Sequence, residues 1–378
     1  MTGDRPKRRL VFVGGGHVHL LSLKNIGRFL DGGAEVTVIA PDRFHYYSGM
    51  GPGMVSRIYE PEQVRFNIQK MVESRGGSFV KDKVASVDAP EKELTLAGGE
   101  KVFYDLLSFN IGSYVPMDRI EGAEKGAIPV KPIENLEKAR RAILEGFQRG
   151  IPKVLIVGAG PAGVELAGNI WRLACSQDGY GEITLASSRD RVLPELPQKA
   201  SSLAQESLSQ RGIHIRSNFR VVNLSQGRAR SKYGEEVRYD VAILTIGIMP
   251  QRIFGNSGLE TAADGALLVN NYLQSTSSPD VFGGGDCIAI HGSRVDRVGV
   301  YAVREAPILF NNLLARLEGK PLKAFKPQKR YLLILNLGDG SGLFVRGSWV
   351  WKGKLAFAFK SFLDRRFMSN FQVSGETG

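Results

Sequence analysis

Cysteine is scarce in this sequence, and its scarcity excludes several kinds of protein. Among 378 residues there are 2 cysteines, Cys175 and Cys287, which lie far apart and form no CxxC pair. A disulfide scaffold and a cysteine-rich zinc site are therefore excluded, and we expect no metal site and a reducing, cytoplasmic compartment. We interpret both cysteines as small buried hydrophobic residues, so electron relay through paired thiols is not expected.

Long hydrophobic runs are also missing. No apolar stretch approaches the roughly 18 to 20 residues that span a bilayer, and the basic stretch 5–9 leads directly into a short strand-like run. Hydrophobic residues make up 43% and charged residues 23% of the chain, which is typical of globular proteins and excludes disordered or collagen-like ones. The length suffices for two or three domains of roughly 100 to 200 residues.

Acidic residues are rare near the C-terminus. Between Lys320 and Phe371 there are eleven basic and two acidic residues, so this segment carries +9 of the total charge of +12. From Lys354 onward, Leu355, Phe359, Phe362, Leu363, Phe367 and Phe371 recur at helical spacing, while Lys360, Asp364, Arg365 and Ser369 occupy other faces. The pattern predicts an amphipathic basic helix over 354–371.

Three partners for this helix stay open. Aromatic side chains beside cations suit an anionic membrane surface, but the same stripe can pack on the rest of the protein or form a homodimer interface. No nucleic acid is expected as a partner, because no recognised binding motif accompanies the charge.

Glycine, by contrast, is abundant, and it marks two similar corners. The run Arg9–Val13 precedes Gly14, Gly15 and Gly16, and the run Lys153–Val157 precedes Gly158, Ala159 and Gly160. Each corner is followed by a helix-compatible stretch and a second strand, at 35–39 and at 182–185. Two βαβ nucleotide-binding units are therefore predicted.

The fold class that follows is α/β with two Rossmann-like dinucleotide-binding domains. The first domain is expected to be discontinuous, with residues 1–117 and 265–320, and the second to comprise residues 118–264. Residues 321–378 form a C-terminal α+β extension that contains the basic helix.

A glycine corner lets a pyrophosphate lie against backbone N–H groups at the N-terminus of a helix. The second corner completes the GxGxxG pattern with Gly163, and its position between a strand and a helix favours dinucleotide binding over a simple turn. In the first corner His19 stands at the third glycine position. We interpret His17 and His19 as residues that pack locally or face solvent near the corner, rather than as cofactor contacts.

The acid that usually binds ribose hydroxyls is absent from both units. The first unit has Ala40 there, with Asp42 two residues further on, and the second has Ser187, followed by Ser188 and Arg189. Hydroxyls and an arginine suit a 2′-phosphate, so NADPH is expected at least to be tolerated. A simple polar loop is an equally open interpretation.

Further motifs resemble a known superfamily. The segments 239–247 (YDVAILTIG) and 104–112 (YDLLSFNIG) resemble the strand and glycine turn that close each nucleotide domain of two-dinucleotide flavoproteins, and 278–286 (SPDVFGGGD) resembles their flavin motif. With 157–167 (VGAGPAGVELA), their order is similar to that of type II NADH dehydrogenases and other pyridine nucleotide-disulfide reductase relatives. The resemblance covers residues 10–322.

A closer resemblance concerns a subfamily. The segments 14–19 (GGGHVH), 46–53 (YYSGMGPG), 300–304 (VYAVR) and 364–368 (DRRFM) are similar to the FAD-containing domain that some bacteria carry fused to selenide, water dikinase. No dikinase domain follows here, so the resemblance implies a stand-alone flavoprotein with a link to selenium metabolism.

The resemblance also implies roles for individual residues. FAD would be bound by Gly14, Gly15, Gly16, Asp42, Gly112, Gly285 and Asp286. NADH or NADPH would be bound by Gly158, Gly160, Gly163, Ser187, Arg189 and Gly247. Glu165, Lys131 and Tyr301 would approach the reacting rings. Simpler interpretations remain: Glu165 as an acid favoured near a helix start, Tyr301 as core packing, and Arg304 with Glu305 as a surface pair.

The implied activity is hydride transfer from NAD(P)H to FAD, followed by electron transfer to a quinone or similar acceptor without a cysteine relay. The protein would be cytoplasmic or peripheral on the inner face of the cell membrane. The alternative is a slow-turnover flavin-binding regulatory or partner protein linked to selenium metabolism.

Overall fold

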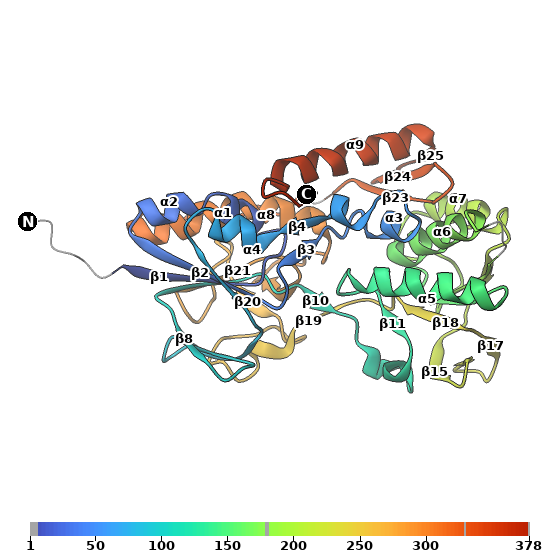
Figure 1. The fold of residues 1–378 in the computed structure, drawn as a ribbon, viewed down its shortest axis with the longest axis horizontal. Coiled ribbons are helices and arrows are strands. Elements are labelled where there is room, and N and C mark those ends of the chain that lie inside the picture. The colour runs from blue at the N-terminus through green and yellow to red at the C-terminus, as the bar shows by residue number, and fades with distance from the viewer. Residues whose placement is uncertain (1–6, 178–180, 329, 377–378) are drawn as a thin grey trace, which may run out of the picture.

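The runs before the two glycine corners form the central strands of two separate parallel sheets, β1 (Arg8–Val13) and β12 (Lys153–Val157). Both runs are apolar and rich in branched side chains, as expected of parallel strands covered on both faces. A computed structural model, which describes residues 7–177, 181–328 and 330–376, shows the two sheets side by side (Figure 1). The predicted α/β class with Rossmann-like domains is confirmed.

The first sheet has the strand order β21-β9-β1-β2-β5. Its strand β21 comes from late in the chain and pairs in parallel with β9, so this unit is built from two separated segments. The other strands are β2 (Ala34–Ala40), β5 (Ser78–Lys81), β9 (Leu106–Phe109) and β21 (Val281–Gly283). Its helices are α1 (Leu20–Lys24), α2 (Ile26–Asp31), α4 (Ile68–Glu73) and α8 (Gly299–Glu318).

The second sheet has the order β11-β18-β12-β13-β14, again all parallel. The strands are β11 (Ile128–Pro129), β13 (Glu182–Ala186), β14 (His214–Arg216) and β18 (Val241–Leu244). The helices beside it are α5 (Asn135–Arg149), α6 (Pro161–Cys175) and α7 (Gln198–Ser209).

Smaller elements complete the two units. Antiparallel three-stranded sheets are formed by β6 (Val84–Asp88), β7 (Glu93–Leu96) and β8 (Lys101–Phe103), and by β15 (Val221–Ser225), β16 (Arg228–Ser231) and β17 (Glu236–Arg238). Strand pairs are β3 (Phe44–Tyr46) with β4 (Arg65–Asn67), β10 (Ser113–Tyr114) with β19 (Met249–Pro250), and β20 (Leu267–Val269) with β22 (Ile288–Ile290). The short helical elements are α3 (Gly51–Val55) and the 3-10 turns at Pro61–Val64, Met117–Arg119, Ala123–Lys125, Arg252–Phe254 and Gly285–Cys287.

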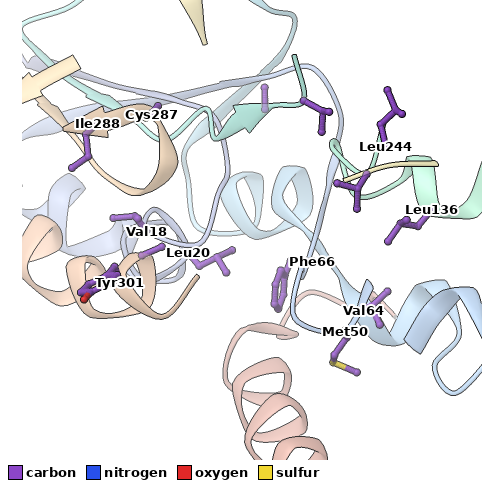
Figure 2. Packing of buried hydrophobic residues seen from close by; sticks show 14 of the residues in the cluster. Val18, Leu20, Met50, Val64, Phe66, Leu136, Leu244, Cys287, Ile288 and Tyr301 are labelled. Carbon is purple, nitrogen blue, oxygen red and sulfur yellow. The ribbon is translucent and has the colours of Figure 1, made fainter. Parts of the chain in front are cut away.

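The hydrophobic core runs through both units without a break. Figure 2 shows Val18 and Cys287 on the side of the first sheet and Leu136 and Leu244 on the side of the second, with Phe66 between them. The continuous core holds the two units in one fixed arrangement.

The C-terminal extension is an antiparallel sheet of β23 (Leu333–Asn336), β24 (Gly342–Arg346) and β25 (Trp349–Gly353), followed by α9 (Lys354–Phe371). In Figure 1, α9 lies along one face of the molecule, above the junction of the two units. No helix within the described ranges is both long enough and apolar enough to cross a membrane.

Helix α9 orients its side chains differently from the sequence prediction. Its buried stripe is Ala356, Lys360, Asp364 and Met368. Lys360 and Asp364, which the sequence pattern puts on faces other than the apolar one, therefore lie inside. The reason is pairing: Lys360 Nζ lies 2.7 Å from Asp364 Oδ2 and donates a hydrogen bond to Gly49 O at 2.7 Å. The apolar side chains of Leu355, Phe359, Phe362 and Leu363 are exposed.

The extension is fixed to the second unit by a contact between glycines. A Cβ atom on Gly168 of α6 would collide with the carbonyl oxygen of Leu337, and Gly338, with φ of +80°, lies against the backbone of Gly168. Only glycine allows this close approach of α6 to the end of β23.

We therefore predict that Gly168→Val lowers the free energy of unfolding by about 1 to 3 kcal/mol, because the added side chain forces the two backbones apart. Thermal unfolding followed by circular dichroism measures the change. Gly27→Ala is the control, since Gly27 lies in an exposed helical position with no atom near its missing Cβ. An unchanged Tm in Gly168→Val would contradict the close approach.

Candidate functional site

The first glycine corner depends on its glycines. Gly14 has φ of +86°, and a Cβ on Gly14 or Gly16 would collide with Asn110. His19 is fully buried, with Nδ1 2.6 Å from Gly14 O and Nε2 2.9 Å from Ser108 Oγ. Burial lowers the pKa of His19 to about 4, so its ring is neutral. His19 thus holds the corner from behind, in agreement with the packing interpretation.

His17 lies immediately after this corner and contacts other aromatic residues. Its Nδ1 lies 3.1 Å from His45 Nε2, and its ring stacks on Phe367 of α9. Burial lowers the pKa of His17 to about 4 as well. His17 is therefore neutral, like His19, and it packs against its aromatic neighbours.

The second corner leaves open backbone where a pyrophosphate would lie. Gly158 has φ of +111° and lies against Thr245, and Gly163 lies directly on the carbonyl of Gly158. Gly160, at the N-terminus of α6, has no atom within 4 Å of its missing Cβ. Exposed N–H groups at a helix start fit a dinucleotide phosphate.

Two of the predicted site residues meet between the units. Lys131, which follows β11 of the second sheet, places Nζ 2.5 Å from Oδ2 of Asp286, which follows β21 of the first sheet. Ser113 Oγ lies 2.8 Å from both atoms. Because each residue follows the carboxyl end of its strand, the contact brings the carboxyl edges of the two sheets together.

A pocket of about 440 Å³ adjoins this contact. Gly285, Asp286, Tyr301 and Glu305 contribute to its wall. Tyr301 is buried, and its hydroxyl donates a hydrogen bond to Gln328 O at 2.8 Å. Tyr301 therefore lines the pocket and also fixes the first part of the C-terminal extension.

Glu165 lies elsewhere, beneath α9. Its Oε1 accepts a hydrogen bond from the backbone N–H of Asn336 at 2.7 Å. Burial raises the pKa of Glu165 to about 7, against the opposing effect of the positive charge of Lys360. We call Tyr47, Glu165, Lys360 and Asp364 the α9 polar cluster, in which the Tyr47 hydroxyl donates to Asp364 at 3.0 Å.

Among the remaining predicted glycines, Gly112 and Gly247 are compatible with close approach of a ligand, and Gly15 is not. Gly112 and Gly247 have φ of +67° and +97° with open space at the missing Cβ, whereas a Cβ on Gly15 would collide with Ile68. Asp42 is exposed, and its Oδ1 accepts the N–H of Phe44 at 2.8 Å. Asp42 therefore stabilises the turn after β2.

The hydroxyl of Ser187 is used within its own loop. It donates to Arg191 O at 2.9 Å and accepts the N–H of Arg189 at 3.2 Å. Ser187 is buried, whereas Ser188 and Arg189 are exposed. The groups after the end of β13 that face solvent are thus the serine hydroxyl at 188, the guanidinium at 189 and the carboxylate of Asp190.

The cysteine interpretation is right for Cys287 and wrong for Cys175. Cys287 is buried, and burial raises the pKa of its thiol to about 12. Cys175 is exposed, because the last residue of α6 lies on the outward side of that helix.

Two buried polar residues near Asp286 were missed. Glu305, for which a surface pair with Arg304 was the simpler of two open interpretations, is 2% exposed, while Arg304 is exposed. Asn110 is 5% exposed and contacts both glycine motifs of the first unit. Helical spacing from Tyr301 and Ala302 places Glu305 on the inner face of α8, which is the signal that could have found it.

Comparison with known proteins gives the context for this geometry. The profile of the pyridine nucleotide-disulphide oxidoreductase family matches residues 8–306. Ferroptosis suppressor protein 1 of Taeniopygia guttata is 27% identical over 315 residues, which are 80% of each chain. Type II NADH:quinone oxidoreductase of Haemophilus influenzae is 29% identical over 227 residues, which are 55% of this chain and 51% of that protein. The structure of NDH2 from Plasmodium falciparum in complex with NADH has a TM-score of 0.84 at 16% identity and covers 98% of both chains.

The chain belongs to the pyridine nucleotide-disulphide oxidoreductase family. It is an NAD(P)H dehydrogenase-like flavoenzyme, and its cofactors are FAD and NAD(P)H.

The raised pKa of Glu165 predicts a pH-dependent stability. The pKa of Glu165 is higher in the folded state than its ordinary value near 4.5. Its protonated form therefore stabilises the fold fully at pH values below 4.5, and this contribution is lost as the pH rises through about 7. Glu165→Gln, which keeps the acceptor for Asn336, should match the wild type in Tm at pH 5 and exceed it by a few degrees at pH 8. Equal Tm values at both pH values would show that Glu165 has an ordinary pKa.

Proposed function

We propose that this enzyme takes hydride from NAD(P)H onto FAD and passes the electrons to a quinone at a membrane surface, without a cysteine intermediate. The observation that carries the proposal is the contact between Lys131 and Asp286, at which the carboxyl edges of both sheets meet. Dinucleotides bind at the carboxyl edges of such sheets, so two cofactors bound by the two units would have their reactive ends close together there.

The residues of the chain have defined parts in this proposal. The corner at Gly14–Gly16 would hold the FAD pyrophosphate at the start of the following helical stretch, and Asp286 would bind the ribityl chain. Lys131 holds a positive charge beside that site, and Tyr301 at the first turn of α8 shapes the pocket. When bound, FAD accepts the hydride and supplies the electrons to the acceptor.

A thiol is not needed and is poorly placed. The raised thiol pKa of Cys287 keeps it protonated, and its Sγ lies 3.3 Å from Gly284 O within the core. A protonated buried thiol is a poor nucleophile. This geometry supports direct electron transfer from the flavin to the acceptor.

The nicotinamide cofactor is proposed to include NADPH. A serine stands where a ribose-binding acid would repel a 2′-phosphate, and the guanidinium of Arg189 is exposed beside it. The second unit therefore offers a positive group and no carboxylate at position 187.

Anaerobic titration of the purified protein with NADPH and then NADH tests the function. We expect both nucleotides to bleach the flavin absorbance. Arg189→Ala should weaken the binding of NADPH by about tenfold and leave the binding of NADH unchanged, because one charge-assisted contact is lost. Arg220→Ala, which removes a different exposed arginine, is the control.

Failure of both nucleotides to bleach bound FAD would contradict hydride transfer. The result would favour the alternative, a slow-turnover flavoprotein that acts as a regulatory partner and is related to the domain fused to selenide, water dikinase.

The membrane part of the proposal comes from the outward face of α9. Leu355, Phe359, Phe362 and Leu363 are exposed, although Lys360 and Asp364 of the same helix are buried. Trp349 of β25 is 74% exposed, and Arg365 and Arg366 are exposed cations on the helix. Apolar side chains flanked by cations fit the interface of an anionic bilayer, where a quinone would be available.

We predict that Phe359→Ser with Phe362→Ser abolishes cosedimentation with phosphatidylglycerol vesicles while the flavin stays bound. The control is Phe103→Ser, because Phe103 is equally an exposed aromatic residue but belongs to β8, on the side away from α9 (Figure 1). Unchanged vesicle binding would contradict the membrane surface. Conversion of a dimer to a monomer in size-exclusion chromatography would instead assign the face to a homodimer.

A further inference from the structure

The peptide between Gly284 and Gly285 is held from both sides by buried side chains. The carbonyl of Gly284 accepts a hydrogen bond from Asn110 Nδ2 at 2.6 Å, and the N–H of Gly285 donates to Glu305 Oε2 at 2.6 Å. Asn110 follows β9 and Glu305 lies in α8, so side chains from two separate elements form hydrogen bonds to the same peptide group. Asp286 is the next residue in the chain.

Asn110 also reaches the first glycine corner. Its Oδ1 accepts a hydrogen bond from the backbone N–H of Val18 at 3.0 Å, and the backbone N–H of Asn110 donates to Val13 O at 2.9 Å. The missing Cβ of Gly16 leaves the space that the Asn110 side chain occupies. Asn110 therefore joins the two glycine motifs of the first unit to each other.

The turn needs such support because its backbone is unusual. Gly285 has φ of +74°, and a Cβ at this position would lie 2.6 Å from Asn110 Nδ2. A glycine turn with positive φ has access to many other conformations. The two side-chain contacts select the one that aims Asp286 at Lys131.

We propose that Asn110 and Glu305 form a clasp that positions the Gly284–Asp286 turn for FAD, and that Glu305 makes the retention of FAD depend on pH. The inference rests on the proposed role of Asp286 in flavin binding. Glu305 acts here as a positioning residue, through Gly285.

The charge of Glu305 gives the direction of the pH effect. Burial raises the pKa of Glu305 to about 7, the N–H of Gly285 lowers it and the negative charge of Asp286 raises it. Around it, Asp286 is paired with Lys131 from the second unit, Arg297 donates to Asp286 O, and Arg304 on the same helix is exposed. FAD carries a diphosphate, so an ionised Glu305 above pH 7 adds a like charge beside an anionic ligand.

The experiment measures release of FAD from the holoprotein after dilution, by the recovery of free-flavin fluorescence at pH 6 and pH 8. For the wild type we expect release to be about fivefold faster at pH 8. Glu305→Gln keeps the acceptor without the charge, so its release should be slow and equal at both pH values. Glu305→Leu removes the acceptor, and its release should be about tenfold faster at both.

Controls separate the clasp from the proposed flavin site and from the general fold. Arg304→Gln, at the exposed neighbouring position, should behave as the wild type, and Tm of each variant reports folding. Asp286→Asn should release FAD faster than the wild type if the flavin site is placed correctly.

If Asp286→Asn releases FAD faster but Glu305→Leu matches the wild type, the clasp is wrong and the flavin site stands. If Asp286→Asn is unchanged, the flavin site itself is wrong. A pH dependence in Glu305→Gln as large as in the wild type would overturn the assignment of the titrating group to Glu305.

Discussion

The ion pair of Lys131 with Asp286 is the interaction on which the rest of the site depends. It joins the end of a strand in one parallel sheet to the end of a strand in the other, and Ser113 accepts and donates beside it. Both groups are partly buried, and removing either would leave a charge without its partner in a region of low dielectric constant. This contact marks the place where the carboxyl edges of the two sheets meet, and the continuous hydrophobic core keeps the two units in that arrangement.

Buried polar groups are placed where two elements must keep a fixed distance. Asn110 and Glu305 grip the flavin-motif turn, and Lys360 with Asp364 fixes α9 to the segment at Gly49. These four side chains all have hydrogen-bond partners, as the cost of desolvation requires. The result is a helix that buries the paired charges of Lys360 and Asp364 beside Ala356 and Met368. Its exposed side chains include the apolar residues Leu355, Phe359, Phe362 and Leu363 and the cations Arg365 and Arg366.

Helix α9 connects the fold to the proposed activity. The α9 polar cluster places Glu165 under the same helix whose outer face is proposed to meet the membrane. An acceptor that dissolves in the bilayer would reach the protein on this side.

The sequence by itself determined the two corners and the strands before them. A short branched apolar run followed by GxG specifies a strand and a tight turn through local sterics, so the strands at Arg8–Val13 and Lys153–Val157 agree with the prediction to within a residue. The same local logic predicted a helix near 354–371.

Only the tertiary structure decided which face of each helix is covered. Helical spacing puts Lys360 and Asp364 on one face, and Tyr301 and Glu305 on another helix's face. The periodicity does not identify which face of a helix packs against the rest of the protein. Lys360 and Asp364 became buried because Gly49 and Tyr47, more than 300 residues away, satisfy their polar atoms. Glu305 became buried because β21 returns to the first sheet and places Gly285 against it. Contacts between distant segments carry no local signal, which is why these residues could not be assigned from the sequence.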